Sequence, residues 1–195
     1  MPAKYTRLDI DKCIFLFVNH EPGLINLVRD FQQHEFQRNV MALAKVAQYY
    51  KSPSVLTTLF DTGPNGPIVK EITDYLPDAP LIRRPGQINA MDIEDFVNEI
   101  KKTSRKQIVI SLIGQGYDVF VVTDATGTFA EYTREAAHKH MVAAGCQLLN
   151  WAAVAGGLHS DWRRDIEGFG AIWTEHIPGY WCVMQSYQAA QKGTE

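Results

Sequence analysis

The sequence predicts an α/β protein: a six-stranded parallel sheet with helices on both faces, in a Rossmann-like three-layer α/β/α sandwich. Short apolar runs alternate with helical patterns along the chain, which is typical of open parallel sheets. The first run, Cys13–Val18, is six apolar residues without interruption, which indicates a strand buried on both faces. At 195 residues and 22.0 kDa, without repeat or linker, the chain is expected to form one domain over residues 1–195.

The other elements are expected where apolar runs and helix signals follow one another. Apolar residues recur at helical spacing from Val40 onward, which predicts a helix after the first strand. Asp92 is expected to cap a second helix. Thr128 and Glu131 form a capping box that opens a third, ending near Gly145. The six expected strands are 13–18, 55–59, 81–83, 107–110, 118–122 and 147–150, and residues 151–191 are expected to be mostly helical.

The connection between the fourth and fifth strands is unusually short for this pattern. Only seven residues, 111–117, separate Ile110 from Asp118, whereas parallel neighbours need a crossover of about a dozen or more. The segment reads like the last turn of a helix that ends at a glycine. Either the chain lacks a crossover helix, or the sequence as written omits a segment between Ile110 and Ser111. The position of this short connection matters because it follows the carboxyl end of the fourth strand, and open parallel sheets bind ligands beyond the carboxyl ends of their strands.

Composition excludes several classes of function. The net charge of −3 and the pI near 6.1 argue against a nucleic-acid binder, which needs clustered Lys and Arg. No apolar run approaches the ~20 residues of a membrane-spanning helix. Three widely spaced cysteines suit a reducing, cytoplasmic compartment. No cofactor and no metal are expected, since phosphate-binding glycine motifs are absent and His138 and His140 fall on different faces of a helix.

Two polar clusters follow expected strands at their carboxyl ends. Asn19-His20-Glu21 follows the first strand; either it belongs to a site, or Asn19 or His20 merely caps the next helix. The segment Arg83-Arg84-Pro-Gly-Gln-Ile-Asn89 similarly follows the third strand; an arginine there could bind an anion or hold a carboxylate, although adjacent arginines are more often one structural and one exposed. The cysteines do not lie beyond strand ends. They are expected to be inert packing residues.

Seven stretches of the chain, taken in order, resemble the isochorismatase-like hydrolases, and within them the YcaC-like branch. They are residues 5–9, 23–30, 57–67 (TTLFDTGPNGP), 84–90 (RPGQINA), 118–124 (DVFVVTD), 159–163 and 165–168. The resemblance implies the same six-stranded α/β/α sandwich. It also implies a homo-oligomer, octameric in close relatives, with no obligatory cofactor and an unidentified small-molecule substrate.

The resemblance further implies a site that combines a cysteine nucleophile, an aspartate that takes its proton, and a lysine or arginine that orients the pair. Arg84 matches the basic member, and Asn19 stands where the aspartate belongs. A neutral amide cannot accept a thiol proton. The cysteine belongs after the fourth strand, in the stretch that is absent after Ile110. Phe60 and Asn89 are carried over as residues lining the substrate pocket, although packing alone could explain both.

Two functions therefore remain. The first is a cysteine-type hydrolase of an unknown small molecule, favoured by the family. The second is a catalytically inactive homologue that serves as an oligomeric binding or structural protein, favoured by Asn19 and by the absent nucleophile.

Overall fold

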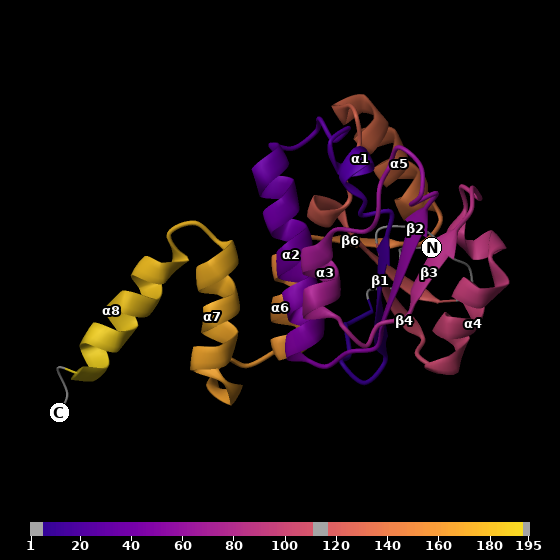
Figure 1. The fold of residues 1–195 in the computed structure, drawn as a ribbon. Helices are drawn as coiled ribbons and strands as arrows, with labels where there is room; N and C mark the ends of the chain where they lie inside the picture. The colour runs from indigo at the N-terminus through magenta and orange to yellow at the C-terminus, as the bar shows by residue number, and fades with distance from the viewer. Residues whose placement is uncertain (1–5, 111–116, 193–195) are drawn as a thin grey trace. The chain divides into compact units, whose positions relative to one another are not determined.

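The computed structural model describes residues 6–110 and 117–192. The chain divides into two compact units, Met1–Leu158 and His159–Glu195. The first contains the whole sheet, and the second is helical (Figure 1).

Six parallel strands form a single sheet in the order β3-β2-β1-β4-β5-β6. Because all strands run in one direction, their carboxyl ends meet at one edge. The chain crosses from β3 at one side of β1 to β4 at the other, so β1 lies at the point where the strand order reverses. This is where open parallel sheets place their ligands. The strands are β1 (Cys13–Val18), β2 (Ser54–Leu59), β3 (Leu81–Arg84), β4 (Gln107–Ile110), β5 (Asp118–Val122) and β6 (Gln147–Leu149).

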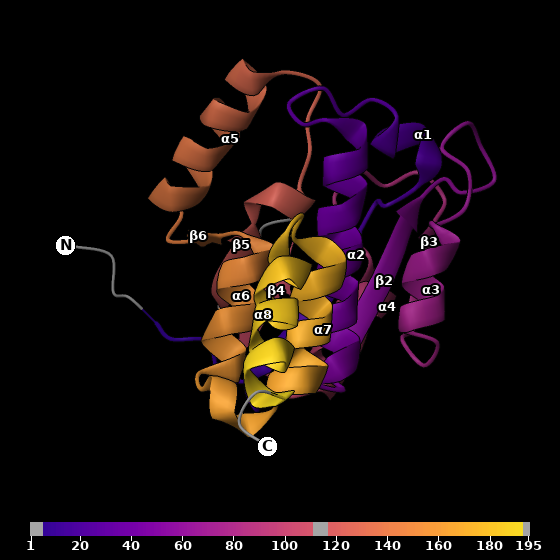
Figure 2. The same cartoon turned by 90° about the vertical axis from the view of Figure 1, so that its left-hand side faces the viewer.

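Helices cover both faces of the sheet, as the sequence predicts. Figures 1 and 2 show α2, α3 and α6 on one side of the strands and α4 and α5 on the other. The α-helices are α1 (Pro22–Ile25), α2 (Gln33–Tyr49), α3 (Lys70–Tyr75), α4 (Glu94–Lys102), α5 (Glu131–Ala143), α6 (Trp151–His159), α7 (Ile166–His176) and α8 (Tyr180–Lys192), with short 3-10 turns η1 (Ala90–Asp92), η2 (Thr123–Ala125) and η3 (Trp162–Arg164).

The core forms because the central strands are apolar on both faces. All six residues of β1 are buried. One continuous cluster joins alternate residues of β1 and β4 to Phe96 and Ile100 of α4 and to Met141 of α5. Those two helical residues of α4 are at most 1% exposed, so the amphipathic helix predicted after Asp92 packs on the sheet by its apolar face.

Two predicted helix starts are wrong. Asp92 does not cap α4; it lies in the turn η1, and α4 begins at Glu94 with no side-chain cap. Thr128 does not open α5, which begins at Glu131. The reason is local: the Thr128 hydroxyl donates to the carbonyl of Ala130, so the two residues form a turn before the helix.

The strands β4 and β5 pair in parallel despite the short link between them. Ile108 lies opposite Val119, and Ile110 opposite Val121. Residues 111–116, where the sequence predicts either a lost crossover or an omitted segment, lie outside the described residues.

The second unit has its own aromatic cluster. The ring of His159 stacks on Phe169 with centroids 3.7 Å apart, and Trp162 lies 5.1 Å from the same phenylalanine. Asp161 caps the turn η3 and pairs with Arg163 at 2.6 Å, so this polar stretch has a structural role. Within the described ranges, no helix is long and apolar enough to cross a membrane.

Candidate functional site

The two residues predicted to be catalytic meet at the carboxyl edge of the sheet. Arg84 ends β3, Asn19 directly follows β1, and the Nη2 group of Arg84 donates to Oδ1 of Asn19. Asn19 has a φ of 60°, in the left-handed region that asparagine tolerates better than most residues. The bond fixes the side-chain amide with its oxygen towards the guanidinium. Neither Asn19 nor His20 caps α1, whose N-cap is Glu21 without a side-chain bond.

Arg84 is buried and held from several directions. It is 1% exposed, and its Nε donates to the Thr57 hydroxyl at 3.1 Å and to the Thr58 carbonyl at 3.0 Å. Its Nη1 donates to the carbonyls of Gln87 at 2.7 Å and Ile88 at 2.9 Å. The rigid fork of a guanidinium can make these bonds together. Arg84 therefore fixes both Asn19 and the loop after β3.

Arg83 and Arg84 have different environments, as expected of adjacent arginines on a strand. The Arg83 side chain is largely exposed and pairs with Asp61 at 2.8 Å. Successive strand residues point to opposite faces, so only Arg84 turns inward.

A buried carboxyl group interacts electrostatically with Arg84. Glu21 is fully buried; its Oε1 accepts the N–H of Leu59, and its Oε2 has no hydrogen-bond partner among the described residues. Burial raises the pKa of Glu21, against the opposing effects of its bond from Leu59 and of Arg84. Burial also lowers the pKa of Arg84, which Glu21 partly offsets. Glu21 belongs to the polar cluster predicted after the first strand, although nothing in the sequence indicates its role.

The two predicted pocket-lining residues lie near Arg84 but do not converge on Asn19. Phe60 is 48% exposed, and its N–H donates to the Arg84 carbonyl at 2.8 Å. The Asn89 side chain accepts the N–H of Met91 at 3.1 Å and donates to Asp92 at 2.9 Å. Asn89 therefore caps η1. This is a structural role, the alternative that the sequence left open for this residue.

None of the cysteines in the first unit lies beside the Arg84–Asn19 pair. Cys13 begins β1, at the opposite end of the strand from Asn19, and burial raises its pKa to about 11. Cys146 is buried just before β6, and burial raises its pKa as well. Both thiols are therefore protonated at neutral pH and unreactive. Cys182 is exposed on α8, in the second unit.

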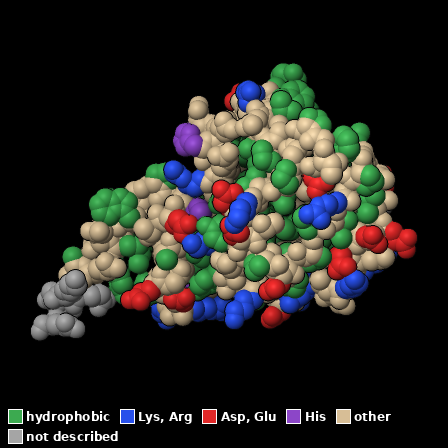
Figure 3. Space-filling view, viewed as in Figure 1, with side chains coloured by type: hydrophobic (Ala, Val, Ile, Leu, Met, Phe, Trp, Pro, Cys, Tyr) green, Lys and Arg blue, Asp and Glu red, His purple; other side chains and the backbone are tan. Residues whose placement is uncertain are grey.

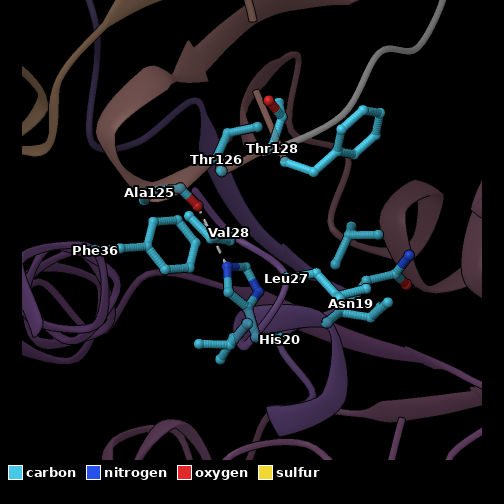
Figure 4. Close-up of a pocket in the computed structure, with 13 residues that line it drawn as sticks. Asn19, His20, Leu27, Val28, Phe36, Ala125, Thr126 and Thr128 are labelled. Atoms are coloured by element: carbon cyan, nitrogen blue, oxygen red, sulfur yellow. Dashed lines mark hydrogen bonds between the residues drawn. The ribbon is translucent and has the colours of Figure 1, made fainter. Parts of the chain in front are cut away.

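A cavity of about 310 Å³ opens beside Asn19, between α1, the start of α2 and the segment after β5 (Figure 4). The lining residues follow the carboxyl ends of β1 and β5, and β4 lies between these two strands. The cavity is therefore at the carboxyl edge of the sheet, where the sequence predicts a ligand site. None of the described residues around it is Lys, Arg, Asp or Glu. They are Val18, Asn19, His20, Leu24, Ile25, Leu27, Val28, Phe36, Ala125, Thr126, Gly127, Thr128 and Phe129.

His20 is the least expected member of this lining. It is 3% exposed, and its Nε2 lies 3.4 Å from the Ala125 carbonyl. Burial lowers the pKa of His20 to about 4, so the ring is neutral at pH 7. Asp124, whose carboxylate accepts the N–H of Trp151 at 2.9 Å, supports the same segment. Its pKa is raised by burial to about 6.

The fold places the protein among the isochorismatase-like α/β proteins. No family model matches the chain. Its structure, however, is similar to that of an isochorismatase family protein from Burkholderia thailandensis, with a TM-score of 0.63 and 15% identity over 76% of this chain and 96% of that one.

The similarity to YcaC proteins is much stronger. The chain is 47% identical over 206 residues to the probable hydrolase YcaC of Escherichia coli K12, covering 98% of this chain and 99% of that protein. YcaC from Pseudomonas aeruginosa matches with a TM-score of 0.91 and 49% identity, over 95% and 98% of the two chains. The E. coli structure, described as an octameric hydrolase of unknown specificity, matches with a TM-score of 0.92 and 46% identity over 96% and 98%. The chain belongs to the family of the YcaC hydrolases, and it has the fold of the isochorismatase-like proteins.

The same alignment shows that this chain is shorter inside the matched region. The match extends over 206 residues, but 98% of 195 residues is only about 191. About 15 positions of the relative therefore have no counterpart here. The unusually short connection after β4 is where the fold predicts such a gap.

Proposed function

We propose that this chain binds a small carbonyl-containing or anionic molecule in the cavity beside Asn19, on the scaffold of a YcaC-type hydrolase. The observation that supports this is the bond from Arg84 to Asn19 at the carboxyl edge of the sheet. Arg84 orients Asn19, and Asn19 contacts the ligand. Phe60 and Asn89 are assigned secondary roles at the rim of the site.

Hydrolysis needs more than the described residues supply. Family chemistry requires a thiolate to attack the carbonyl carbon and a base to take the thiol proton. The Asn19 amide cannot act as that base, and Cys13 and Cys146 lie away from it. With the sequence as printed, we therefore propose binding without turnover. Turnover by the family's thiol mechanism becomes the favoured function only if the protein contains a cysteine segment between Ile110 and Ser111.

Intact mass spectrometry of the protein purified from its own source decides between these two functions. A mass of 22.0 kDa supports a binding protein without turnover. A mass well above that value would reveal the additional segment, and peptide mapping would then show whether it contains a cysteine after Ile110. That result would overturn the non-catalytic proposal.

The binding proposal is tested by comparing two adjacent arginines. We expect Arg84→Ala to weaken binding of cyclohexanecarboxamide or cyclohexanecarboxylate, measured by isothermal titration calorimetry, because Asn19 loses its fixed orientation. Arg83→Ala is the matched control, since the Arg83 side chain is largely exposed and forms its ion pair with Asp61. Equal affinity in the two variants would mean that Arg84 is structural only.

Four further properties belong to the same proposal. Relatives match nearly the whole chain, which favours one isochorismatase-like domain over residues 1–195. The octameric relative favours a homo-oligomer. Three free cysteines favour a reducing, cytoplasmic location. Acidic and basic side chains are interspersed over most of the face seen in Figure 3, which favours a small molecule over nucleic acid as the ligand.

A further inference from the structure

Glu21 is a buried carboxyl group that the proposed binding site does not use. It is 0% exposed and lies two residues after Asn19 in the chain. Its Oε1 accepts the N–H of Leu59, and its Oε2 is buried without a hydrogen-bond partner among the described residues. An enclosed carboxyl group cannot contact a ligand or take a proton from one. Its place in the fold therefore points to a task that needs no such contact.

Glu21 and Arg84 hold the end of β2 from its two sides. β2 lies between β1 and β3 in the sheet (Figure 1), with Glu21 after β1 and Arg84 at the end of β3. On the β3 side, Arg84 donates to the Thr57 hydroxyl at 3.1 Å. On the β1 side, Glu21 accepts from Leu59, and the N–H of Asn19 donates to the Thr57 carbonyl at 2.9 Å. The same short piece of β2 therefore positions all three side chains of this edge.

Arg84 is a buried cation whose hydrogen-bond acceptors are all neutral. Within the described part of the chain they are a hydroxyl, three backbone carbonyls and a side-chain amide, from Thr57, Thr58, Gln87, Ile88 and Asn19. These groups satisfy the N–H donors of the guanidinium but leave its charge without an ionised partner. A buried charge without an opposite charge nearby is strongly destabilising.

Glu21 can supply that opposite charge. Arg84 counteracts the rise that burial causes in the pKa of Glu21, and Glu21 counteracts the fall that burial causes in the pKa of Arg84. The neighbouring cation, Arg83, is engaged by Asp61 at 2.8 Å. Because Oε1 accepts from Leu59, a protonated Glu21 would have its hydrogen on Oε2, where no described residue accepts it. The surroundings therefore favour the ionised form of Glu21.

We propose that Glu21 is the counter-charge of Arg84, which neutralises the guanidinium from outside the cavity and, through the end of β2, keeps Arg84 and Asn19 in place. Glu21 is thus a positioning residue that does not contact the ligand. Without its charge, the cavity edge would have the unopposed charge of Arg84 and would attract anions more strongly. The consequence for ligands rests on the proposed function, whereas the charge pair itself does not.

A double-mutant cycle tests the charge pair without any ligand. Glu21→Gln keeps an acceptor for the N–H of Leu59 but removes the charge, and Arg84→Met removes the cation. In urea unfolding at pH 7, we expect Glu21→Gln to favour the folded state about tenfold more in the Arg84→Met protein than in the wild type, because there Glu21 has lost its partner. Equal effects in the two backgrounds would overturn the pairing.

A second measurement needs only the wild type and Glu21→Gln, in case Arg84→Met does not fold. The carbon-13 NMR signal of the Glu21 carboxyl group is assigned by its absence from Glu21→Gln. We expect the chemical shift of an ionised carboxylate at pH 7. A protonated carboxyl group at this pH would refute Glu21 as the counter-charge.

The effect on the binding site is tested with two ligands of similar shape and different charge. By isothermal titration calorimetry, we expect cyclohexanecarboxylate to bind about three- to tenfold more tightly to Glu21→Gln than to the wild type, and cyclohexanecarboxamide to bind alike. Glu71→Gln, at an exposed position in the first turn of α3, is the matched control and should change neither affinity.

The outcomes separate this inference from the proposed function. If both affinities changed in parallel in Glu21→Gln, Glu21 would have a structural role only, and the inference would be wrong while the proposed function stood. If neither ligand bound to the wild type, the proposed function would be contradicted, and the charge pair would still be decided by the double-mutant cycle.

Discussion

His20, which is buried, and Asp124, which is half-buried, are titratable residues that support the cavity, and they respond to pH in opposite directions. Burial lowers the pKa of His20 from 6.5 to about 4, so between these values the unfolded state binds more protons than the folded state. The free energy of unfolding therefore falls as the pH falls through this window. The raised pKa of Asp124, about 6, makes the folded state the better proton binder over much of the same range.

Because the two effects oppose each other, the contribution of His20 must be measured as a difference. We expect His20→Phe to lose about 2 kcal/mol of the acid-induced destabilisation between pH 8 and pH 5. Urea unfolding of both proteins at several pH values measures it. If the free energy of unfolding changed equally with pH in the wild type and the variant, the pKa of His20 would be the same in the folded and unfolded states.

Arg84 is expected to be more sensitive to substitution than the neighbouring Arg83, even when the charge is kept. Arg84→Lys retains a cation but cannot hold the carbonyls of Gln87 and Ile88 together with Asn19. We expect it to lower the free energy of unfolding by about 1–3 kcal/mol. Arg83→Lys, at an exposed ion pair, should change it by about 0.5 kcal/mol or less. Similar values in urea unfolding would mean that the fork geometry at Arg84 is unimportant.

At the scale of elements, the cavity is framed by a contact between the loop after α1 and the turn before α5. Asp30 accepts the N–H of Thr128 at 2.8 Å, and the Thr128 carbonyl accepts the N–H of Arg29 at 2.8 Å. Arg134 of α5 donates to the Asp30 carbonyl at 3.0 Å. These bonds join two segments about a hundred residues apart, next to Val28 and Gly127 of the cavity wall.

Removing the Asp30 carboxylate should loosen this frame. We expect Asp30→Ala to lower the free energy of unfolding by about 1–3 kcal/mol, because it leaves the Thr128 N–H without its acceptor. The control is Asp78→Ala, at an exposed turn, which should stay within about 0.5 kcal/mol of wild type. Differential scanning calorimetry provides the comparison; equal losses in the two variants would contradict a framing role for Asp30.

These elements also show where prediction from sequence succeeds. The bounds of β1, β4 and β5 were predictable because uninterrupted apolar runs have one stable environment, the middle of a parallel sheet. The Arg84–Asn19 contact was predictable in outline, since the carboxyl ends of β1 and β3 share an edge. The cavity was not, because it depends on His20 meeting Ala125 across more than a hundred residues. In the sequence alone, His20 is equally typical of a helix cap.

At the scale of the whole molecule, several large apolar side chains of the first unit are left exposed in the isolated chain. Ile88 is 83% exposed, Tyr132 73% and Phe129 64%. Ile88 lies in the loop that Arg84 holds, and Phe129 lines the cavity. Apolar surface of this kind is typical of faces that another chain covers, so assembly and ligand binding are expected to involve neighbouring residues.

The relative described as octameric suggests eight chains for the expected assembly. Eight copies of a 22.0 kDa chain have a mass of about 176 kDa, and sedimentation velocity at several protein concentrations should detect that species. We expect the octamer to persist on dilution, because burying exposed side chains such as Ile88 makes dissociation costly. A monomer of about 22 kDa at all concentrations would contradict the octamer.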